Sequence, residues 1–525
     1  MNVAEILYHH ARDRPNALAI VDTTRGKDQT WSFAALDRAA AQRAALLDDT
    51  GLKPGDAVLV LQPMSAELYI TLVAIFRLGL IAMFLDPVSD RRDIERSLEL
   101  NRPRGLIAGT KAHFLRLLCP ALRRIPFKFS VGSPLPGTIS LRRARHLEPR
   151  DVIQTCGLDT PALLTFTSGS TGQPKAAVRS HGFLLAQHRA LTQESQAAPG
   201  EVDLGTLPLF VLANLASGIT SVIPKADLRY PAAVDPASVV TQMQHYRPTR
   251  VSASPAFLER LIEYCDRYNR DLPRVEKIFV GGAPVFPRLV DALHKVAPSA
   301  EVIAVYGSTE AEPIAYVERD EITPEDKTAM ISGHGLLVGR PVAAIRVRIL
   351  PDRWGEPIGP YTRDEFESVC LGQSEVGEIV VTGEHVLTGY LGGRGDEETK
   401  FSVEGTRWHR TGDAGYLDQY ERLWLLGRCA ARITDISGTV YPLSVECAAR
   451  QCAGVRCAAL VAERDRRVLA VELADPALDV SYLEKTVRKL GVHAIRVLKR
   501  IPVDRRHNSK IDYPRLNKLL HDCSS

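Results

Sequence analysis

Short apolar runs alternate with helix-length amphipathic segments over the first three hundred residues of this chain. The runs occupy residues 18–21, 57–61, 105–108, 162–166, 277–280 and 302–305. Apolar runs of this length between amphipathic segments are typical of buried strands connected by helices. The pattern therefore predicts an α/β fold built in layers.

The most apolar stretch, residues 68–85, contains Arg77 and Gly79. These two residues divide it into a helix over 68–79 and a buried strand over 80–85. A membrane-spanning helix needs about 20 predominantly apolar residues, so we expect no transmembrane segment. The first twenty residues mix acids, bases and histidines, which does not fit the apolar core of a signal peptide and favours a cytoplasmic protein.

The pattern changes in the second half of the chain. Residues 344–350 and 378–383 have strand character without long helices between them, which indicates an antiparallel, barrel-like region. From residue 427 onward we expect a compact α+β unit, with strands over 455–463, 466–473 and 494–500 and a helix over 481–491. The predicted domains are therefore residues 1–426 and 427–525. Residues 123–150 are poorly periodic and rich in Pro and Arg, so we interpret them as a surface excursion.

Composition adds little to this picture. The 525 residues are 45% hydrophobic and 24% charged, as in soluble globular proteins, and the formal net charge of +4 argues neither for nor against an anionic partner. Nine scattered cysteines lack the paired spacing of zinc sites. Three nearby arginines have no aromatic residues between them, which favours a solvated face over a nucleic-acid site: Arg142, Arg143 and Arg145.

The strongest chemical signal is the sequence LTFTSGSTGQPK at residues 164–175. Small residues let backbone N–H groups and hydroxyls approach phosphate oxygens, while Lys175 offsets their charge. A flexible linker has a similar composition, but linkers seldom lie between two strand-like stretches. Gln173 and Pro174 interrupt the GxxxxGK[ST] pattern, so P-loop chemistry is not expected. The candidate phosphate-binding residues are Thr167, Ser168, Gly169, Ser170, Thr171, Gly172 and Lys175.

Three further motifs later in the chain have residues suited to binding a nucleotide. GGAP (Gly281, Gly282, Ala283, Pro284) allows a flat adenine ring to lie against backbone, although a simple β-turn has the same sequence. YGSTE supplies an aromatic face at Tyr306, close backbone at Gly307, hydroxyls at Ser308 and Thr309, and one carboxylate at Glu310 that suits Mg²⁺. Asp413, in the sequence HRTGD, can accept two hydrogen bonds from ribose hydroxyls.

In this order, the motifs resemble those of the acyl-adenylate-forming superfamily, which includes acyl-CoA synthetases and peptide-synthetase adenylation domains. The resemblance covers nearly the whole chain. It implies a large adenylation domain with layered α/β subdomains and a distorted β-barrel, followed by a small mobile C-terminal domain. It also implies ATP and Mg²⁺ as cofactors, a ribose contact from Arg428, and catalytic roles for Lys510, Thr309 and Glu310 in adenylation.

The acceptor of the acyl group is less closely defined by these motifs. Where acyl-CoA synthetases carry an aromatic or histidine after PLF, this chain reads PLFVLAN at residues 208–214, and Ala430 replaces a charged hinge residue. The segments PGEVDLGTLPLF and VDRRHNSKI are similar to those of β-lactone synthetases of bacterial olefin biosynthesis. That resemblance implies a fatty or β-hydroxy fatty acid as the substrate, with its own hydroxyl as the acceptor.

Two other functions remain open at this stage. One is acyl transfer to CoA or to a carrier-protein thiol, and the other is a non-catalytic nucleotide-binding scaffold. A carrier protein or a condensing enzyme is a possible partner, and no nucleic acid is expected. Five apolar residues are candidates for lining an acyl pocket, although their composition fits a role in the hydrophobic core equally well: Phe210, Val211, Leu212, Leu215 and Phe257.

Overall fold

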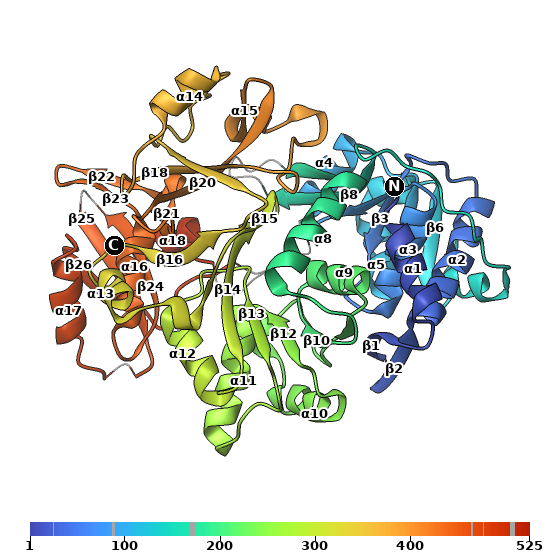
Figure 1. Cartoon of the computed structure of the whole chain (residues 1–525), viewed down its shortest axis with the longest axis horizontal. Helices are drawn as coiled ribbons and strands as arrows, with labels where there is room; N and C mark the ends of the chain where they lie inside the picture. Colours follow the sequence, from blue (N-terminus) through green and yellow to red (C-terminus); the bar gives the residue numbers. More distant parts are fainter. Residues whose placement is uncertain are drawn as a thin grey trace. The chain divides into compact units, whose positions relative to one another are not determined.

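The computed structural model describes residues 1–24, 26–86, 90–168, 174–463, 466–475, 477–504 and 510–524 (Figure 1). The chain forms two compact units. The first unit consists of Met1–Leu228, Ala237–Ser252 and Gly389–Gly395, and the second consists of Arg229–Pro236, Ala253–Thr388 and Asp396–Ser525.

The first unit contains a seven-stranded sheet in the order β7-β6-β5-β3-β4-β8-β9. All neighbours are parallel except β8 and β9, which form an antiparallel hairpin. The strands are β3 (Ala57–Leu61), β4 (Ile81–Phe84), β5 (Gly105–Gly109), β6 (Phe127–Val131), β7 (Ile139–Ser140), β8 (Pro161–Ser168) and β9 (Pro174–Ser180). Parallel strands joined by helices are the arrangement that the apolar runs predicted.

A second group of strands in this unit has the order β12-β10-β11-β1-β2. These strands are β1 (Leu18–Thr24), β2 (Lys27–Ser32), β10 (Val202–Gly205), β11 (Thr220–Val222) and β12 (Arg250–Ala253). The helices of the unit are α1 (Ala4–Asp13), α2 (Phe33–Asp49), α3 (Ala66–Arg77), α4 (Arg91–Leu100), α5 (Thr110–His113), α6 (Leu115–Leu118), α7 (Pro120–Arg124), α8 (His181–Ser195), α9 (Pro208–Ser217) and α10 (Pro236–Tyr246).

The second unit begins with parallel strands β13 and β14 and continues with antiparallel strands in the order β14-β15-β16-β21-β20-β18-β17. Within the described residues these strands form an open series. The strands are β13 (Lys277–Val280), β14 (Glu301–Ser308), β15 (Ala311–Glu318), β16 (Leu336–Pro341), β17 (Arg346–Leu350), β18 (Gly377–Thr382), β19 (Lys400–Val403), β20 (Thr406–Leu417) and β21 (Leu423–Arg428). The helices are α11 (Pro255–Tyr268), α12 (Pro287–Val296), α13 (Pro324–Ile331), α14 (Arg363–Val369) and α15 (Asp396–Thr399).

The C-terminal part of the second unit is a three-stranded sheet, β24-β25-β26, with a separate β22–β23 hairpin. Its elements are β22 (Ile433–Asp435), β23 (Gly438–Val440), α16 (Pro442–Gln451), β24 (Val455–Glu463), β25 (Arg466–Leu473), α17 (Ser481–Arg488), β26 (Ala494–Val497) and α18 (Tyr513–Ser524). Two hydrophobic clusters in this part draw all their residues from positions after 427.

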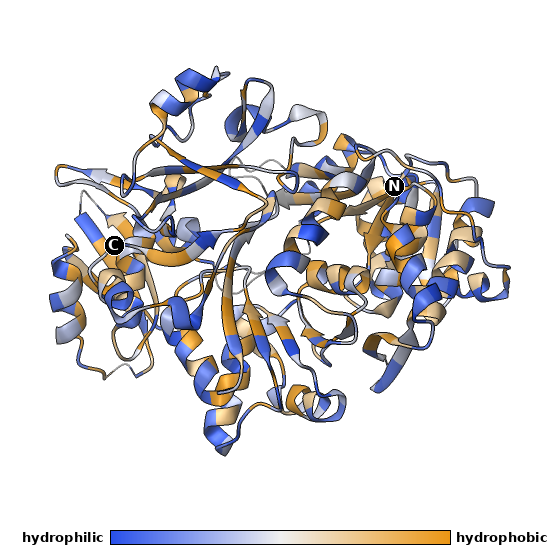
Figure 2. Ribbon diagram, in the orientation of Figure 1, coloured by the Kyte–Doolittle hydropathy of each residue, from blue (hydrophilic) through white to orange (hydrophobic). Residues whose placement is uncertain are grey.

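Hydrophobicity follows these layers. In Figure 2 the strands β13 and β14 are largely hydrophobic, whereas helix α11 carries both hydrophobic and hydrophilic residues. The buried side of α11 includes Phe257, Leu258 and Leu261, each 0% exposed. A helix with one apolar side packs that side against a sheet and leaves the other to water.

All six predicted apolar runs are strands, and the stretch over 68–85 is the helix α3 followed by strand β4. The antiparallel region is also confirmed, since β18 pairs antiparallel with β17 and β20. The interpretation of residues 123–150 as a surface excursion was wrong in part, because β6 lies inside the sheet and buries Phe129 completely. No helix in the described ranges is long and apolar enough to cross a membrane.

Candidate active site

Tyr306, Asp413 and Arg428 meet in the second unit. Tyr306 lies near the end of β14, and Asp413 on β20 stands directly opposite Arg428 on β21. The Tyr306 hydroxyl donates to Asp413 Oδ2 over 2.7 Å, and Arg428 Nη1 donates to Asp413 Oδ1 over 2.7 Å. Asp413 is 9% exposed. Three residues predicted to bind nucleotide are therefore one hydrogen-bonded group.

The electrostatics of this group keep the Tyr306 phenol neutral and the Arg428 guanidinium charged. Burial raises the pKa of the Tyr306 phenol, and the neighbouring Asp413 carboxylate raises it further, so the phenol stays a neutral donor. The Asp413 carboxylate also raises the pKa of the Arg428 guanidinium. An ionised carboxylate has about four lone-pair sites, so Asp413 retains acceptor capacity for ribose hydroxyls.

Close backbone approach explains the glycines of both neighbouring motifs. Gly281, Gly282, Ala283 and Pro284 follow the end of β13, and Gly282 has φ +86°, a conformation that side chains disfavour. A Cβ on Gly307 would lie 3.0 Å from the backbone oxygen of Ala311. Gly282 is therefore required by its backbone conformation and Gly307 by the close approach of the neighbouring strand, and contact of these motifs with an adenine ring stays a prediction.

Glu310 lies in the tight turn between β14 and β15. Ser308 pairs with Ala311 across this turn, so that only Thr309 and Glu310 connect the strands. The Glu310 N–H donates to Ser308 Oγ over 3.2 Å, and the Leu387 N–H donates to the Glu310 carbonyl over 2.7 Å. The turn is thus fixed on both sides through its backbone.

Lys400 is a neighbour of this turn that sequence reasoning missed. It is 4% exposed on β19, and its ammonium donates to the Leu387 carbonyl. Burial lowers the pKa of Lys400 to about 7, although the Glu310 and Asp396 carboxylates act in the opposite direction. The sequence offers no signal for it, since a lysine at the start of a short strand ordinarily extends into water.

The phosphate-loop residues lie in the first unit. Gly169, Ser170, Thr171 and Gly172 fall outside the described residues, and Thr167 and Ser168 end strand β8. Lys175 lies opposite Thr167 in the β8–β9 hairpin, is 8% exposed and stands 6.0 Å from the centre of the Tyr390 ring. Its side chain passes close to the backbone of Gly395, where a Cβ would be 2.6 Å from Lys175 Cδ.

Lys510 belongs to the second unit and is exposed. Its backbone is held by reciprocal contacts with Asp504: the Asp504 N–H donates to the Lys510 carbonyl over 2.8 Å, and the Lys510 N–H donates to Asp504 Oδ1 over 3.1 Å. The catalytic role of Lys510 stays a prediction.

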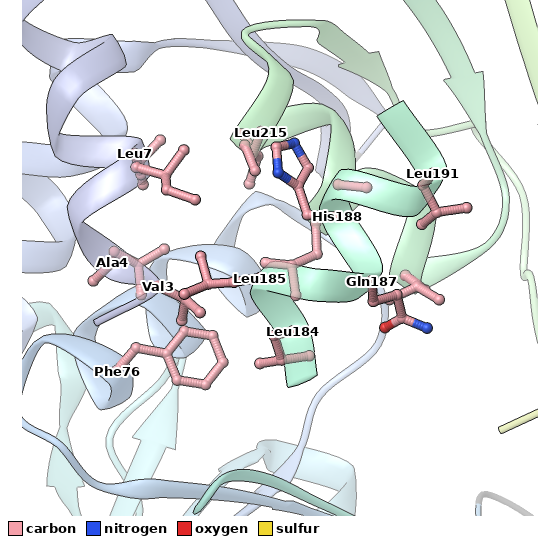
Figure 3. A pocket seen from close by; sticks show the side chains of 16 residues that line it. Val3, Ala4, Leu7, Phe76, Leu184, Leu185, Gln187, His188, Leu191 and Leu215 are labelled. Carbon is pink, nitrogen blue, oxygen red and sulfur yellow. The ribbon is translucent and has the colours of Figure 1, made fainter. Parts of the chain in front are cut away.

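An apolar pocket lies in the first unit among helices α1, α3, α8 and α9 (Figure 3). The space between its side chains amounts to about 610 Å³ when the open solvent at its mouth is included. Leu7, Phe76 and Leu185 contribute to it from three of these helices, and His188 Nε2 lies 3.0 Å from Ser217 Oγ at its side. Burial lowers the pKa of His188.

Two of the predicted acyl-contact residues, Leu212 and Leu215 on α9, line this pocket. Phe210 and Val211 are buried on the same helix but are not among the lining residues. Phe257 belongs to α11 in the second unit, where it is fully buried. The acyl-binding role of this set stays a prediction.

Comparison with known proteins identifies the family. The AMP-binding enzyme family matches residues 7–391 of the chain. The chain belongs to the AMP-binding enzyme family. The olefin beta-lactone synthetase of Stenotrophomonas maltophilia is 33% identical over 98% of this chain and 97% of its own length. The olefin beta-lactone synthetase of Xanthomonas campestris is 31% identical over 98% of this chain and 96% of its own length.

Solved structures share the fold. The amide bond synthetase McbA from Marinactinospora thermotolerans superposes with a TM-score of 0.81 at 22% identity, covering 98% of this chain and 99% of its own. ATP-bound MatB from Rhodopseudomonas palustris also has a TM-score of 0.81, at 20% identity over 100% of both chains. This AMP-binding enzyme is therefore similar over its whole length to olefin beta-lactone synthetases and has the fold of adenylate-forming enzymes.

Proposed function

We propose that this AMP-binding enzyme activates a β-hydroxy fatty acid with ATP and closes the resulting acyl-AMP to a β-lactone. The observation that carries the proposal is the near full-length similarity to two olefin beta-lactone synthetases, at 33% and 31% identity. The shared fold alone supports adenylation but does not distinguish among acceptors, because one fold hosts many reactions.

In the first step a substrate carboxylate oxygen attacks the α-phosphorus of ATP. A bond forms between that oxygen and phosphorus, the bond to the β-phosphate oxygen breaks, and pyrophosphate leaves. Positioning and charge stabilisation account for most of the catalysis in such transfers. Asp413, held by Tyr306 and Arg428, would bind the ribose, and Lys175 and Lys510 would offset the negative charge.

The residues present fit Mg²⁺. In the described part of the chain, no three His, Cys, Asp or Glu side chains gather into a metal cluster. Mg²⁺ typically takes one or two protein carboxylates and completes its coordination with water and phosphate oxygens. Glu310, in its fixed turn, would be that carboxylate. When bound, the ion would neutralise phosphate charge.

In the second step the β-hydroxyl oxygen of the substrate attacks its own acyl carbonyl carbon. A carbon–oxygen bond closes the four-membered ring, the bond from the carbonyl carbon to the AMP oxygen breaks, and the hydroxyl proton passes to solvent. An intramolecular acceptor needs no second substrate site, because the reacting groups are already connected.

Transfer to a thiol is the second candidate. The 2-succinylbenzoate--CoA ligase of Enterococcus faecalis is 25% identical over 85% of this chain, so CoA ligases are also relatives. Ala430 lies in the short helix Cys429–Ala431. At this position the acyl-CoA synthetases that the chain resembles carry a charged hinge residue. This replacement favours a reaction that does not depend on thioester formation.

The test is a product analysis of the purified enzyme with ATP, Mg²⁺ and a β-hydroxy fatty acid, with and without CoA. We expect AMP, pyrophosphate and a product lighter than the substrate by one water, at equal rates in both conditions. The matched control is the same acid without its hydroxyl, which should stop at acyl-AMP. Acyl-CoA as the main product would favour the thiol ligase, and absent pyrophosphate exchange across a panel of fatty acids would favour a non-catalytic scaffold.

A further inference from the structure

Positive charge is concentrated in one segment of the first unit. Residues 101–147 contain ten Lys and Arg and no Asp or Glu, so their formal charge of +10 exceeds the +4 of the whole chain. This segment forms β5, α5, α6, α7, β6 and β7, and its three strands are the ones at the β7 edge of the seven-stranded sheet. The nucleotide-binding motifs lie elsewhere in the sequence and do not account for it.

The same segment exposes a group of large apolar side chains, which we call the apolar tip. Its members are Phe114, Leu115, Leu117 and Leu118, which are 59%, 38%, 71% and 67% exposed. Single exposed apolar residues are common on protein surfaces, but a contiguous group marks a site of interaction. Four of them within five positions are such a group.

The apolar tip is anchored to the sheet. His113, immediately before it, is 4% exposed, and its Nε2 lies 2.9 Å from the Phe129 carbonyl on β6. Cys119 and Leu122, immediately after it, are 2% and 0% exposed. Because the residues on both sides of the apolar tip are buried, the exposed side chains between them extend into solvent from a packed part of the unit.

Basic side chains surround the apolar tip. Lys111, Arg123 and Arg124 are exposed on its flanks, and Arg116 lies within it. Arg116 Nη1 is 3.3 Å from His113 Nδ1. Burial lowers the pKa of both His113 and Lys128, and the charge of Arg116 lowers each further. These groups repel one another, so this part of the unit suits an anionic surface.

We propose that the corner formed by α5, α6 and α7 docks the enzyme onto an anionic lipid surface, with the apolar tip entering the interface and the basic residues contacting headgroups. Apolar side chains with flanking Lys and Arg are the composition of interfacial membrane-binding segments. A protein partner fits less well, because binding hot spots are enriched in Trp, Tyr and Arg and depleted in Leu. Three of the four tip residues are Leu.

The first measurement is flotation of the full-length enzyme with vesicles. We expect it to float with vesicles of equimolar phosphatidylcholine and phosphatidylglycerol, and at least tenfold less with phosphatidylcholine alone. Raising the salt from about 0.1 M to about 1 M shortens the Debye length from about 10 Å to about 3 Å and should weaken the binding.

Two double variants separate the contributions. Leu117→Ser with Leu118→Ser removes the apolar contacts, and Arg123→Glu with Arg124→Glu reverses two charges. Each should lower the bound fraction on anionic vesicles at least tenfold. The matched apolar control is Val152→Ser with Leu158→Ser, which are 67% and 57% exposed, and the charge control is Arg274→Glu, 85% exposed. Both controls should bind as the unmodified enzyme does.

Pyrophosphate exchange with a short, water-soluble acid provides the check on folding, and all variants should retain it. The proposal is overturned if the tip variant floats as well as the unmodified enzyme, since the contact is then purely electrostatic. It is equally overturned if the unmodified enzyme does not float with the anionic vesicles. Neither result depends on whether the second step yields a lactone.

Discussion

Asp413 holds two protein donors while presenting its remaining lone pairs to a ligand. Tyr306 and Arg428 each occupy one of its oxygens at 2.7 Å. Hydrogen bonds to charged groups contribute about 1.5–3 kcal/mol each, roughly twice the neutral value. The carboxylate is consequently held in advance for its proposed contact with the ribose of ATP, an arrangement that would reduce the conformational entropy lost on binding.

This arrangement predicts graded effects on ATP binding. Tyr306→Phe removes one hydroxyl donor and should weaken ATP about fivefold, as the loss of about 1 kcal/mol implies. Asp413→Asn removes the charge that holds Arg428 and should weaken ATP at least tenfold. Calorimetric titration with ATP measures both. Equal affinities in the two variants would contradict the larger role that we assign to the Asp413 charge.

Lys510 should behave differently, because its proposed contribution comes in the transition state. Lys510→Ala should lower the rate of pyrophosphate exchange by about 10²- to 10³-fold and leave ATP affinity within about twofold. Lys485→Ala, an exposed lysine on α17, is the matched control. A parallel loss of ATP affinity and rate would assign Lys510 to ground-state binding instead.

Among helices and strands, the C-terminal helix α18 is joined to α16 and β24 through one buried carboxyl. Glu446 on α16 is 4% exposed and accepts from the Tyr513 hydroxyl over 2.7 Å and from the Leu460 N–H over 2.9 Å. Burial raises the pKa of Glu446 to about 7, although both hydrogen bonds act in the opposite direction. The link between these elements is therefore sensitive to pH.

The sign of this sensitivity follows from proton binding. Between its ordinary pKa of 4.5 and about pH 7, Glu446 keeps its proton when folded and loses it when unfolded. The folded state binds more protons in that window, so the free energy of unfolding falls as pH rises, by about 3 kcal/mol at most. Glu446→Gln should lack this fall, and Glu325→Gln, at an exposed position, should retain it. Urea unfolding between pH 5 and about 8 measures the difference, and parallel curves would contradict it.

Each of the six apolar runs marked a strand, but the pattern missed β6, which lies next to the edge strand β7. The runs at residues 57–61 and 302–305 lie in β3 and β14, because four or five consecutive apolar residues suit a strand buried on both faces. Strand β6 reads FKFSV, in which Lys128 interrupts the run and prolines and arginines surround it. Its pairing with β5 depends on a distant segment that local pattern does not register.

For the chain as a whole, the domain division stays a prediction. The proposed boundary after residue 426 lies inside the second unit. The two hydrophobic clusters beyond it are nevertheless self-contained, with Leu460 and Leu469 in one and Leu516 in the other, all at most 1% exposed. A part that buries its own core is expected to fold independently.

We accordingly predict that residues 427–525 fold when produced alone. Circular dichroism should show a cooperative thermal transition, and the amide proton spectrum should be well dispersed. A fragment that starts at residue 455 omits α16 and both strands of the β22–β23 hairpin, and should not fold, because Val445 and Ala449 are part of the cluster. A disordered 427–525 fragment would place the boundary elsewhere.

The sequence alone determined the α/β class, the positions of many of the buried strands and the ordered series of nucleotide motifs, since these depend on neighbours within a few residues. The tertiary structure decided which side chains meet. Tyr306 and Asp413 are 107 positions apart, yet they share a hydrogen bond. It also decided that Lys400 is buried while Leu117 and Leu118 are exposed. Burial and hydrogen bonding are set by distant segments that pack together, and local pattern carries no record of them.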